Sequence, residues 1–139
     1  FSSVFEDYNV KQKEDWHKME KLMKDAVLYK TNPQYVYEYA AVMLAYLYWK
    51  DYDFTENDNM ANIYFYLYLC PENFNNTLVK SYTDLKLSER TLIRYRKRFV
   101  NSFKAQQKKL RKLVKSDDAE LLDHILKNIE ENKIADDFN

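Results

Sequence analysis

Residues 77–99 of the chain read TLVKSYTDLKLSERTLIRYRKRF, and their apolar spacing predicts a short helix, a turn and a longer helix. Three apolar residues of the short helix would share one face: Val79, Tyr82 and Leu85. Leu87 follows a turn of three to four residues, and Ser88 is a residue type that caps helix N-termini. This stretch therefore has the layout of a helix-turn-helix.

The second helix of this layout is amphipathic and has a basic outer face. Its buried face would hold Leu92, Tyr95 and Phe99. The opposite face carries Glu89, Arg90, Arg94, Lys97 and Arg98. Such a helix suits the major groove of DNA, which is about 12 Å wide, and Arg binds guanine O6 and N7 through two N–H groups. Ser88 and Thr91, near the helix N-terminus, are placed to donate hydrogen bonds to a phosphate.

Residues 85–99 also follow a family pattern: Leu, one residue, an apolar residue, Ser, two residues, Thr, an apolar residue, one residue, Arg and an aromatic residue. The matching positions are Leu85, Leu87, Ser88, Thr91, Leu92, Arg94 and Tyr95. Through them, residues 77–103 resemble the helix-turn-helix of sigma-70 region 4 and of phage late-gene transcriptional regulators of the ArpU type. The resemblance implies sequence-specific DNA binding and control of transcription initiation. The chain departs from the pattern at Lys86, where Gly is usual in the turn, and at Tyr82, where a small residue is usual.

Charge is segregated around this motif. The chain has 22 Lys+Arg and 22 Asp+Glu, so its formal net charge is zero. Residues 80–115 hold thirteen basic residues and every arginine, opposed only by Asp84 and Glu89, which leaves a net charge of +11. Such asymmetry is typical of a protein whose partner carries many phosphates. The alternatives are a solvated helix face, or a face that pairs with the acidic parts of the same chain.

The absence of Gly narrows the classes of fold and function. Without Gly there is no GxGxxG motif, no Walker loop and no Gly-based nucleophile elbow. Two prolines and no glycine also argue against an all-β fold, which needs many turns. Hydrophobic residues make up 46% of the chain, enough to form a core. We therefore expect an all-α fold of five to six helices.

Helical spacing places these helices along the chain. The expected elements are helices at 7–29, 35–49, 60–70, 76–85 and 88–115, and a last helix capped by residues 116–118. Asn32 and Pro33 are expected to start the second helix, and Pro71 to end the third. Residues 51–54 are expected to form a polar break, followed by a capping box at residues 55–58.

We expect two parts: an N-terminal aromatic-rich helical subdomain, 1–71, and a C-terminal part, 72–139, with the helix-turn-helix, the long basic helix and the last helix. The N-terminal helices offer an interface for a homodimer or another partner. The lower part of the long helix would pair either with the last helix or with a second chain. The aromatic side chains at 35–49 and 64–68 are interpreted as core rather than as a platform for single-stranded nucleic acid.

Nothing in the sequence indicates catalysis, a metal or a cofactor. His17 and His124 are far apart and lack ligand spacing, and Cys70 has no base near it in the sequence. The single cysteine fits a reducing compartment, no signal peptide is visible, and no apolar run reaches the roughly 20 residues of a membrane span. We therefore expect a cytoplasmic protein that is not an enzyme and has no membrane partner.

The function expected from the sequence is that of a DNA-binding transcriptional regulator of phage or mobile-element type, with double-stranded DNA and RNA polymerase or another regulatory protein as partners. The predicted DNA-binding residues are Lys86, Ser88, Glu89, Arg90, Thr91, Arg94, Lys97, Arg98 and Lys104. The alternative is a helical protein-interaction module whose basic helix docks an acidic partner. Arginines that are exposed and unpaired would favour nucleic acid, whereas bridges to acidic residues of the same chain would count against it.

Overall fold

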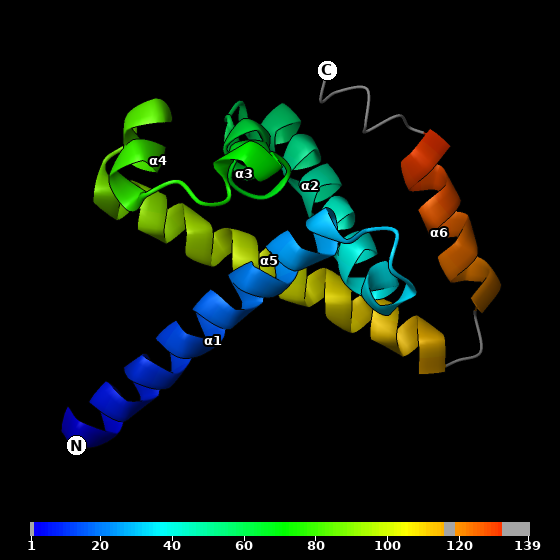
Figure 1. The fold of residues 1–139 in the computed structure, drawn as a ribbon, viewed down its shortest axis with the longest axis horizontal. Helices are drawn as coiled ribbons and strands as arrows, with labels where there is room; N and C mark the ends of the chain where they lie inside the picture. The colour runs from blue at the N-terminus through cyan, green and yellow to red at the C-terminus, as the bar shows by residue number, and fades with distance from the viewer. Residues whose placement is uncertain (1, 116–118, 132–139) are drawn as a thin grey trace.

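The computed structural model describes residues 2–115 and 119–131, and in these ranges the chain forms six α-helices and no strand (Figure 1). The helices are α1 (Ser2–Leu28), α2 (Val36–Glu56), α3 (Met60–Tyr68), α4 (Leu78–Asp84), α5 (Glu89–Lys115) and α6 (Ala119–Glu131). Short 3₁₀ turns at Pro33–Tyr35 and Pro71–Asn73 precede α2 and follow α3. The expected all-α class is confirmed. None of the described helices combines the length and the apolar character that crossing a bilayer requires.

The long helix α5 is the centre of the fold. It makes its most extensive contact with α2, α1 crosses it, and α6 packs against both α5 and α2 (Figure 1). The packing of α6 on α5 buries Leu110 and Ile129 in the common core, so the long helix pairs with the last helix of its own chain. Residues on both sides of position 71 belong to one hydrophobic cluster.

Aromatic side chains fill this core. Tyr64, Tyr68 and Phe99 are fully buried, and the rings of Tyr64 and Phe99 meet edge to face at 5.3 Å. The hydroxyl of Tyr64 donates to the Val42 carbonyl at 2.7 Å, and the Trp49 indole N–H donates to Ser102 at 2.9 Å. Buried tyrosines and tryptophans need such partners for their polar atoms.

The expected break at residues 51–54 is wrong, because α2 continues to Glu56. The segment contains no Gly or Pro to break it, and Asn57 ends the helix in the left-handed conformation (φ 55°). The capping box at 55–58 is also wrong. The carboxylate of Asp53, still within α2, accepts the backbone N–H groups of Met60 and Ala61 at 2.7 and 2.6 Å and so caps α3 instead.

The other predicted helix boundaries agree with the structure to within a few residues. The side chain of Asn32 caps the 3₁₀ turn before α2, with Pro33 as its first residue, and Pro71 follows the end of α3. The predicted cap of the last helix, residues 116–118, lies outside the described residues. Among the apolar residues of α6, Ile129 is buried, and Ile125 and Leu126 are half-buried.

Candidate nucleic-acid interface

The turn between α4 and α5 has the geometry of a Schellman motif. The Leu87 N–H donates to the Tyr82 carbonyl at 2.9 Å, and the Lys86 N–H donates to the Thr83 carbonyl at 3.2 Å. Lys86 itself is in the left-handed conformation, with φ 57°. Glycine favours this region because it has no Cβ, which explains physically why Gly is usual at this position in the pattern that residues 85–99 resemble.

Replacing Lys86 with Gly is expected to raise the free energy of unfolding by about 0.5–1 kcal/mol, because a residue with a Cβ is strained in the left-handed region. Urea denaturation followed by circular dichroism measures the change. Asn57→Gly is the matched control at the other left-handed position. It should gain less because Asn tolerates this conformation. A loss of stability in Lys86→Gly would contradict the interpretation.

Two hydroxyl groups organise the starts of the motif's helices. Thr77 Oγ1 accepts the Lys80 N–H at 3.1 Å and caps α4. Ser88 Oγ accepts the Thr91 N–H at 3.1 Å and caps α5, as expected. Ser88 Oγ also donates to Thr91 Oγ1 at 2.9 Å, which leaves the Thr91 hydroxyl proton as the one available to a phosphate.

The packing of the motif agrees with the sequence on α5 but not throughout α4. Leu92 and Phe99 are fully buried, and Tyr95 is half-buried beside them. Val79 was expected to join the buried face of α4, but its side chain is 59% exposed. Leu78, Tyr82 and Leu85 of the seven-residue helix α4 contact the core, so at the start of α4 the core contact comes from Leu78 rather than Val79.

Seven of the predicted DNA-binding residues are exposed on the outer surface of the turn and α5: Lys86, Ser88, Glu89, Arg90, Arg94, Lys97 and Lys104. Thr91 is half-buried. Arg98 does not belong to this surface. Its guanidinium lies 5.1 Å from the Trp49 ring centre and 5.5 Å from that of Tyr52, and it donates to the Tyr52 hydroxyl at 3.4 Å. Cation–π contacts hold Arg98 against the aromatic side chains of α2, so the prediction that Arg98 lies on the outer face is wrong.

A buried ion pair joins α1 to α5, and sequence analysis missed it. Arg96 binds the Glu20 carboxylate through two N–H groups, at 2.5 and 3.0 Å, and the Tyr68 hydroxyl donates to the same carboxylate at 2.6 Å. Burial lowers the pKa of Arg96, but its interactions with Glu20 outweigh that effect and raise it. Burial first, and then Glu20, raise the pKa of Tyr68 well above its usual value.

The sequence did contain a signal for this pair. Glu20 lies on the apolar side of α1, four positions after Trp16 and three before Met23, where a carboxylate is out of place. Arg96 likewise lies between Leu92 and Phe99, which are four and three positions away from it. Opposite charges on two buried faces predict a pair, although not which helices meet.

Seven exposed cations of α5 form a straight stripe along one side of the helix, and an eighth exposed cation, Lys109, lies beside it. The stripe consists of Arg90, Arg94, Lys97, Lys104, Lys108, Arg111 and Lys112. Successive members are three, four or seven positions apart, apart from the adjacent last pair, so they share one face. No salt bridge joins any of them to a carboxylate among the side chains that the structure describes. Arg90 and Lys112 are 22 positions apart, which is about 33 Å at 1.5 Å per residue.

A groove of about 910 Å³ runs beside the first half of the stripe, between α1, α4 and α5. Its apolar lining comes from Trp16, Met19, Leu78, Ile93 and Val100. Lys97 and Lys104 line the groove and also belong to the stripe. The indole N–H of Trp16 is buried and has no hydrogen-bond partner within the described part of the protein. Lys97 and Lys104 therefore lie beside a partly apolar groove that Asp15 and Glu89 also line.

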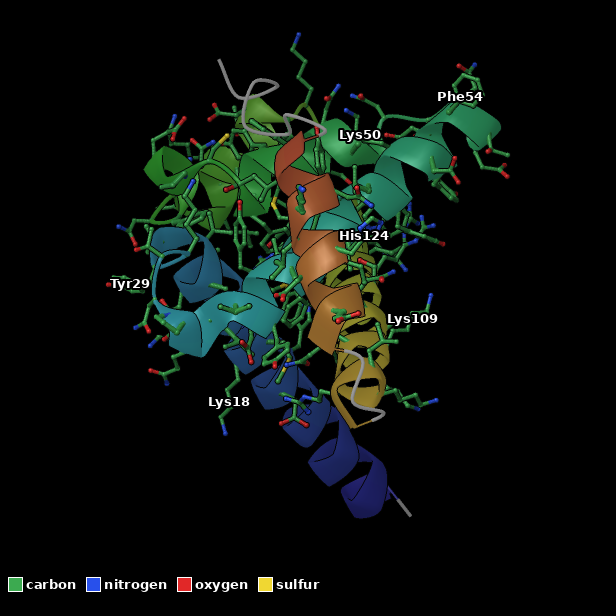
Figure 2. The ribbon with its side chains drawn as sticks, turned by 90° about the vertical axis from the view of Figure 1, so that its right-hand side faces the viewer. Lys18, Tyr29, Lys50, Phe54, Lys109 and His124 are labelled. Atoms are coloured by element: carbon green, nitrogen blue, oxygen red, sulfur yellow. The ribbon has the colours of Figure 1, made fainter. Side chains whose placement is uncertain are left out.

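The remaining chemically active side chains do not gather into a site. Burial raises the pKa of the Cys70 thiol to about 11, with Glu72 adding to the effect, so the thiolate that a nucleophile needs is disfavoured. His124 is exposed on α6, and His17 is exposed on α1, with Nδ1 3.9 Å from Glu20. Figure 2 shows His124 on α6. Among the described residues, no three potential metal ligands come together.

No family model, curated protein or solved structure matches the chain. The likeness to sigma-70 region 4 and the ArpU-type regulators therefore stays a resemblance of residues 77–103. The candidate interface is defined by the geometry of α4, the turn and α5, together with the stripe.

Proposed function

We propose that this protein is a transcriptional regulator that binds double-stranded DNA through the helix-turn-helix formed by α4 and α5. The observation that carries the proposal is the stripe of seven exposed cations on α5, none of them bridged to a described carboxylate. A surface that nothing in the chain neutralises suits a polyanion, because each phosphate contact releases counterions.

The positions of the side chains suggest a division of roles within the interface. Recognition helices contact base edges with their N-terminal residues, so Arg90 and Arg94 face guanine and Glu89 faces the amino group of cytosine. Lys86 in the turn and Lys97 contact phosphates on either side of the groove. Arg96 and Arg98 are committed to Glu20 and to the aromatic rings of α2, so they hold α5 rather than DNA.

Exposed and unpaired arginines favour binding of nucleic acid over docking of the basic helix on acidic parts of the same chain. Arg90 and Arg94 are exposed, and the cationic contact of Arg94 is with the neighbouring Tyr95 ring at 5.5 Å. Only one of the arginines on the first half of α5, Arg96, pairs with a carboxylate among the described residues, and that pair is buried. An acidic protein partner remains the alternative that the following test addresses.

Fluorescence anisotropy with a labelled mixed-sequence duplex of about 20 base pairs, roughly two turns of DNA, tests the proposal. If about five phosphates are neutralised, log K should fall against log salt with a slope of about −4 to −5. On this duplex Arg94→Ala should weaken binding severalfold, because it removes one of the exposed cations that attract the phosphates.

Lys18→Ala is the matched control. It removes the same charge from an exposed position on α1, and Figure 2 shows Lys18 pointing away from α5. Its affinity for DNA should be unchanged within about twofold, because a distant exposed charge is largely screened. Absence of binding to any duplex at about 50 mM salt would overturn the proposal and favour an acidic protein partner.

A further inference from the structure

The second half of the stripe differs from the first in its position on α5 and in its residue types. We call Lys104, Lys108, Arg111 and Lys112 the distal cluster. With Ala105 and Gln107 it lines a shallow depression of about 530 Å³ formed by α5 alone. Asn101 stands between the distal cluster and Lys97, so the stripe has a neutral interval at its middle.

Because the stripe is longer than the major groove is wide, its two halves would contact different parts of a DNA duplex. The major groove is about 12 Å wide, whereas Arg94 and Lys108 are 14 positions, or about 21 Å, apart along a straight helix. A helix that inserts its N-terminal end into the groove therefore carries the distal cluster out beyond the base pairs being read. Only the sugar-phosphate backbone is within reach of cations placed there.

The residue types in the two halves of the stripe match this difference between base contacts and backbone contacts. The first half of the stripe contains two arginines, whose planar fork suits the paired acceptors of guanine. The distal cluster contains three lysines and one arginine. Lysine is a compact point charge on a flexible stem, which suits a phosphate and carries little sequence information.

A merely solvated helix face does not account for the distal cluster. Lys108 lies four positions from both Lys104 and Lys112, and like charges at this spacing destabilise a helix. A solvated face usually intersperses Glu with Lys, but residues 90–115 contain no acidic residue. Helices α2 and α6 pack on the opposite face of α5, where Phe103 and Leu110 are buried, so they leave the distal cluster exposed to solvent.

We infer that α5 is divided into two functional parts, an inference that rests on the proposed DNA binding. Arg90 and Arg94 select the bases, and the distal cluster binds backbone phosphates outside the selected sequence, whatever that sequence is. The first part decides specificity, and the second supplies most of the salt-dependent affinity.

Two variants separate these roles. The quadruple variant K104Q/K108Q/R111Q/K112Q removes the distal charges and keeps good helix formers on α5. Arg94→Lys keeps the charge but removes the bidentate fork. The control quadruple variant, K18Q/K21Q/K30Q/K50Q, has the same change in net charge at exposed positions on α1, the following loop and α2. Circular dichroism and urea unfolding establish that all three fold.

The readouts are the salt slope on a mixed-sequence duplex and the sequence selected from a duplex library randomised in its centre. In the distal variant, the slope should become less steep by about 3 to 4, because each of the four lost phosphate contacts contributes about 0.9, and affinity near 0.1 M salt should fall at least tenfold. The distal variant should still select the wild-type sequence. Arg94→Lys should keep the slope and lose a selected G·C pair.

A distal variant whose slope equals that of the control, or which selects a different sequence, would overturn the division of α5 while leaving DNA binding intact. Loss of both slope and selected sequence in Arg94→Lys would overturn it as well. If the wild-type protein binds no duplex at all, the proposed function itself is wrong, so the two failures are distinguishable.

Discussion

Glu20→Ala is expected to lower the free energy of unfolding by about 3–5 kcal/mol, the largest effect we expect from a polar substitution in this protein. The Glu20 side chain is 6% exposed and that of Arg96 is 19% exposed, so the substitution leaves a buried guanidinium without its counter-charge. The Tyr68 hydroxyl loses its acceptor at the same time. Since domains are stable by only about 5–15 kcal/mol, this is a substantial fraction of the total.

Urea unfolding of Glu20→Ala and of the double variant Glu20→Met/Arg96→Met measures this effect. Replacing both charges with apolar side chains of similar length removes the unpaired ion, so the double variant should recover most of the lost stability. Lys80→Ala is the control, because Lys80 and Asp84 form an exposed salt bridge at 3.2 Å that should contribute less than about 1 kcal/mol. A Glu20→Ala protein as stable as the control would contradict a structural role for the pair.

Phe99→Ala is expected to cost about 3–5 kcal/mol, because it opens a cavity where α2, α3 and α5 meet. The Phe99 ring is fully buried and lies edge to face with Trp49 and Tyr64, both at 5.3 Å, and with Tyr68 at 6.1 Å. Aromatic neighbours on three sides cannot close the space without leaving their own hydrogen-bonding positions.

Thermal and urea unfolding, compared with Phe54→Ala, test this prediction. Phe54 is 92% exposed near the end of α2, and Figure 2 shows it projecting from the helix, so its loss should change stability by less than about 0.5 kcal/mol. Phe99→Leu should keep most of the volume and lose less than Phe99→Ala. Equal stabilities for Phe99→Ala and Phe54→Ala would contradict the central place of Phe99 in the core.

Local sequence was sufficient to predict the elements of the candidate interface. The cap at Ser88, the buried positions Leu92 and Phe99, and the exposed Arg90 and Arg94 follow from chemistry within about one helical turn of each residue. The left-handed turn at Lys86 was marked by the family pattern, although the residue there is not Gly. These features depend on the spacing of side chains along one helix.

Contacts between distant residues were beyond such reasoning. Asp53 caps a helix that begins seven positions later, Arg98 is drawn to rings on α2, and Arg96 meets Glu20 across 76 positions. The spacing and charge of these side chains along the chain do not indicate their contacts, because the partner that decides each side chain's role is brought near only by the fold.

The sequence by itself determined that the chain is helical, where most helices begin and end, and that one helix carries nearly all the unbalanced positive charge. The tertiary structure decided which of those charges are available. It neutralised Arg96 with Glu20, covered Arg98 with aromatic rings and left the seven cations of the stripe open to solvent. The physical reason is that charge belongs to the residue, whereas desolvation and pairing depend on what other helices place against it.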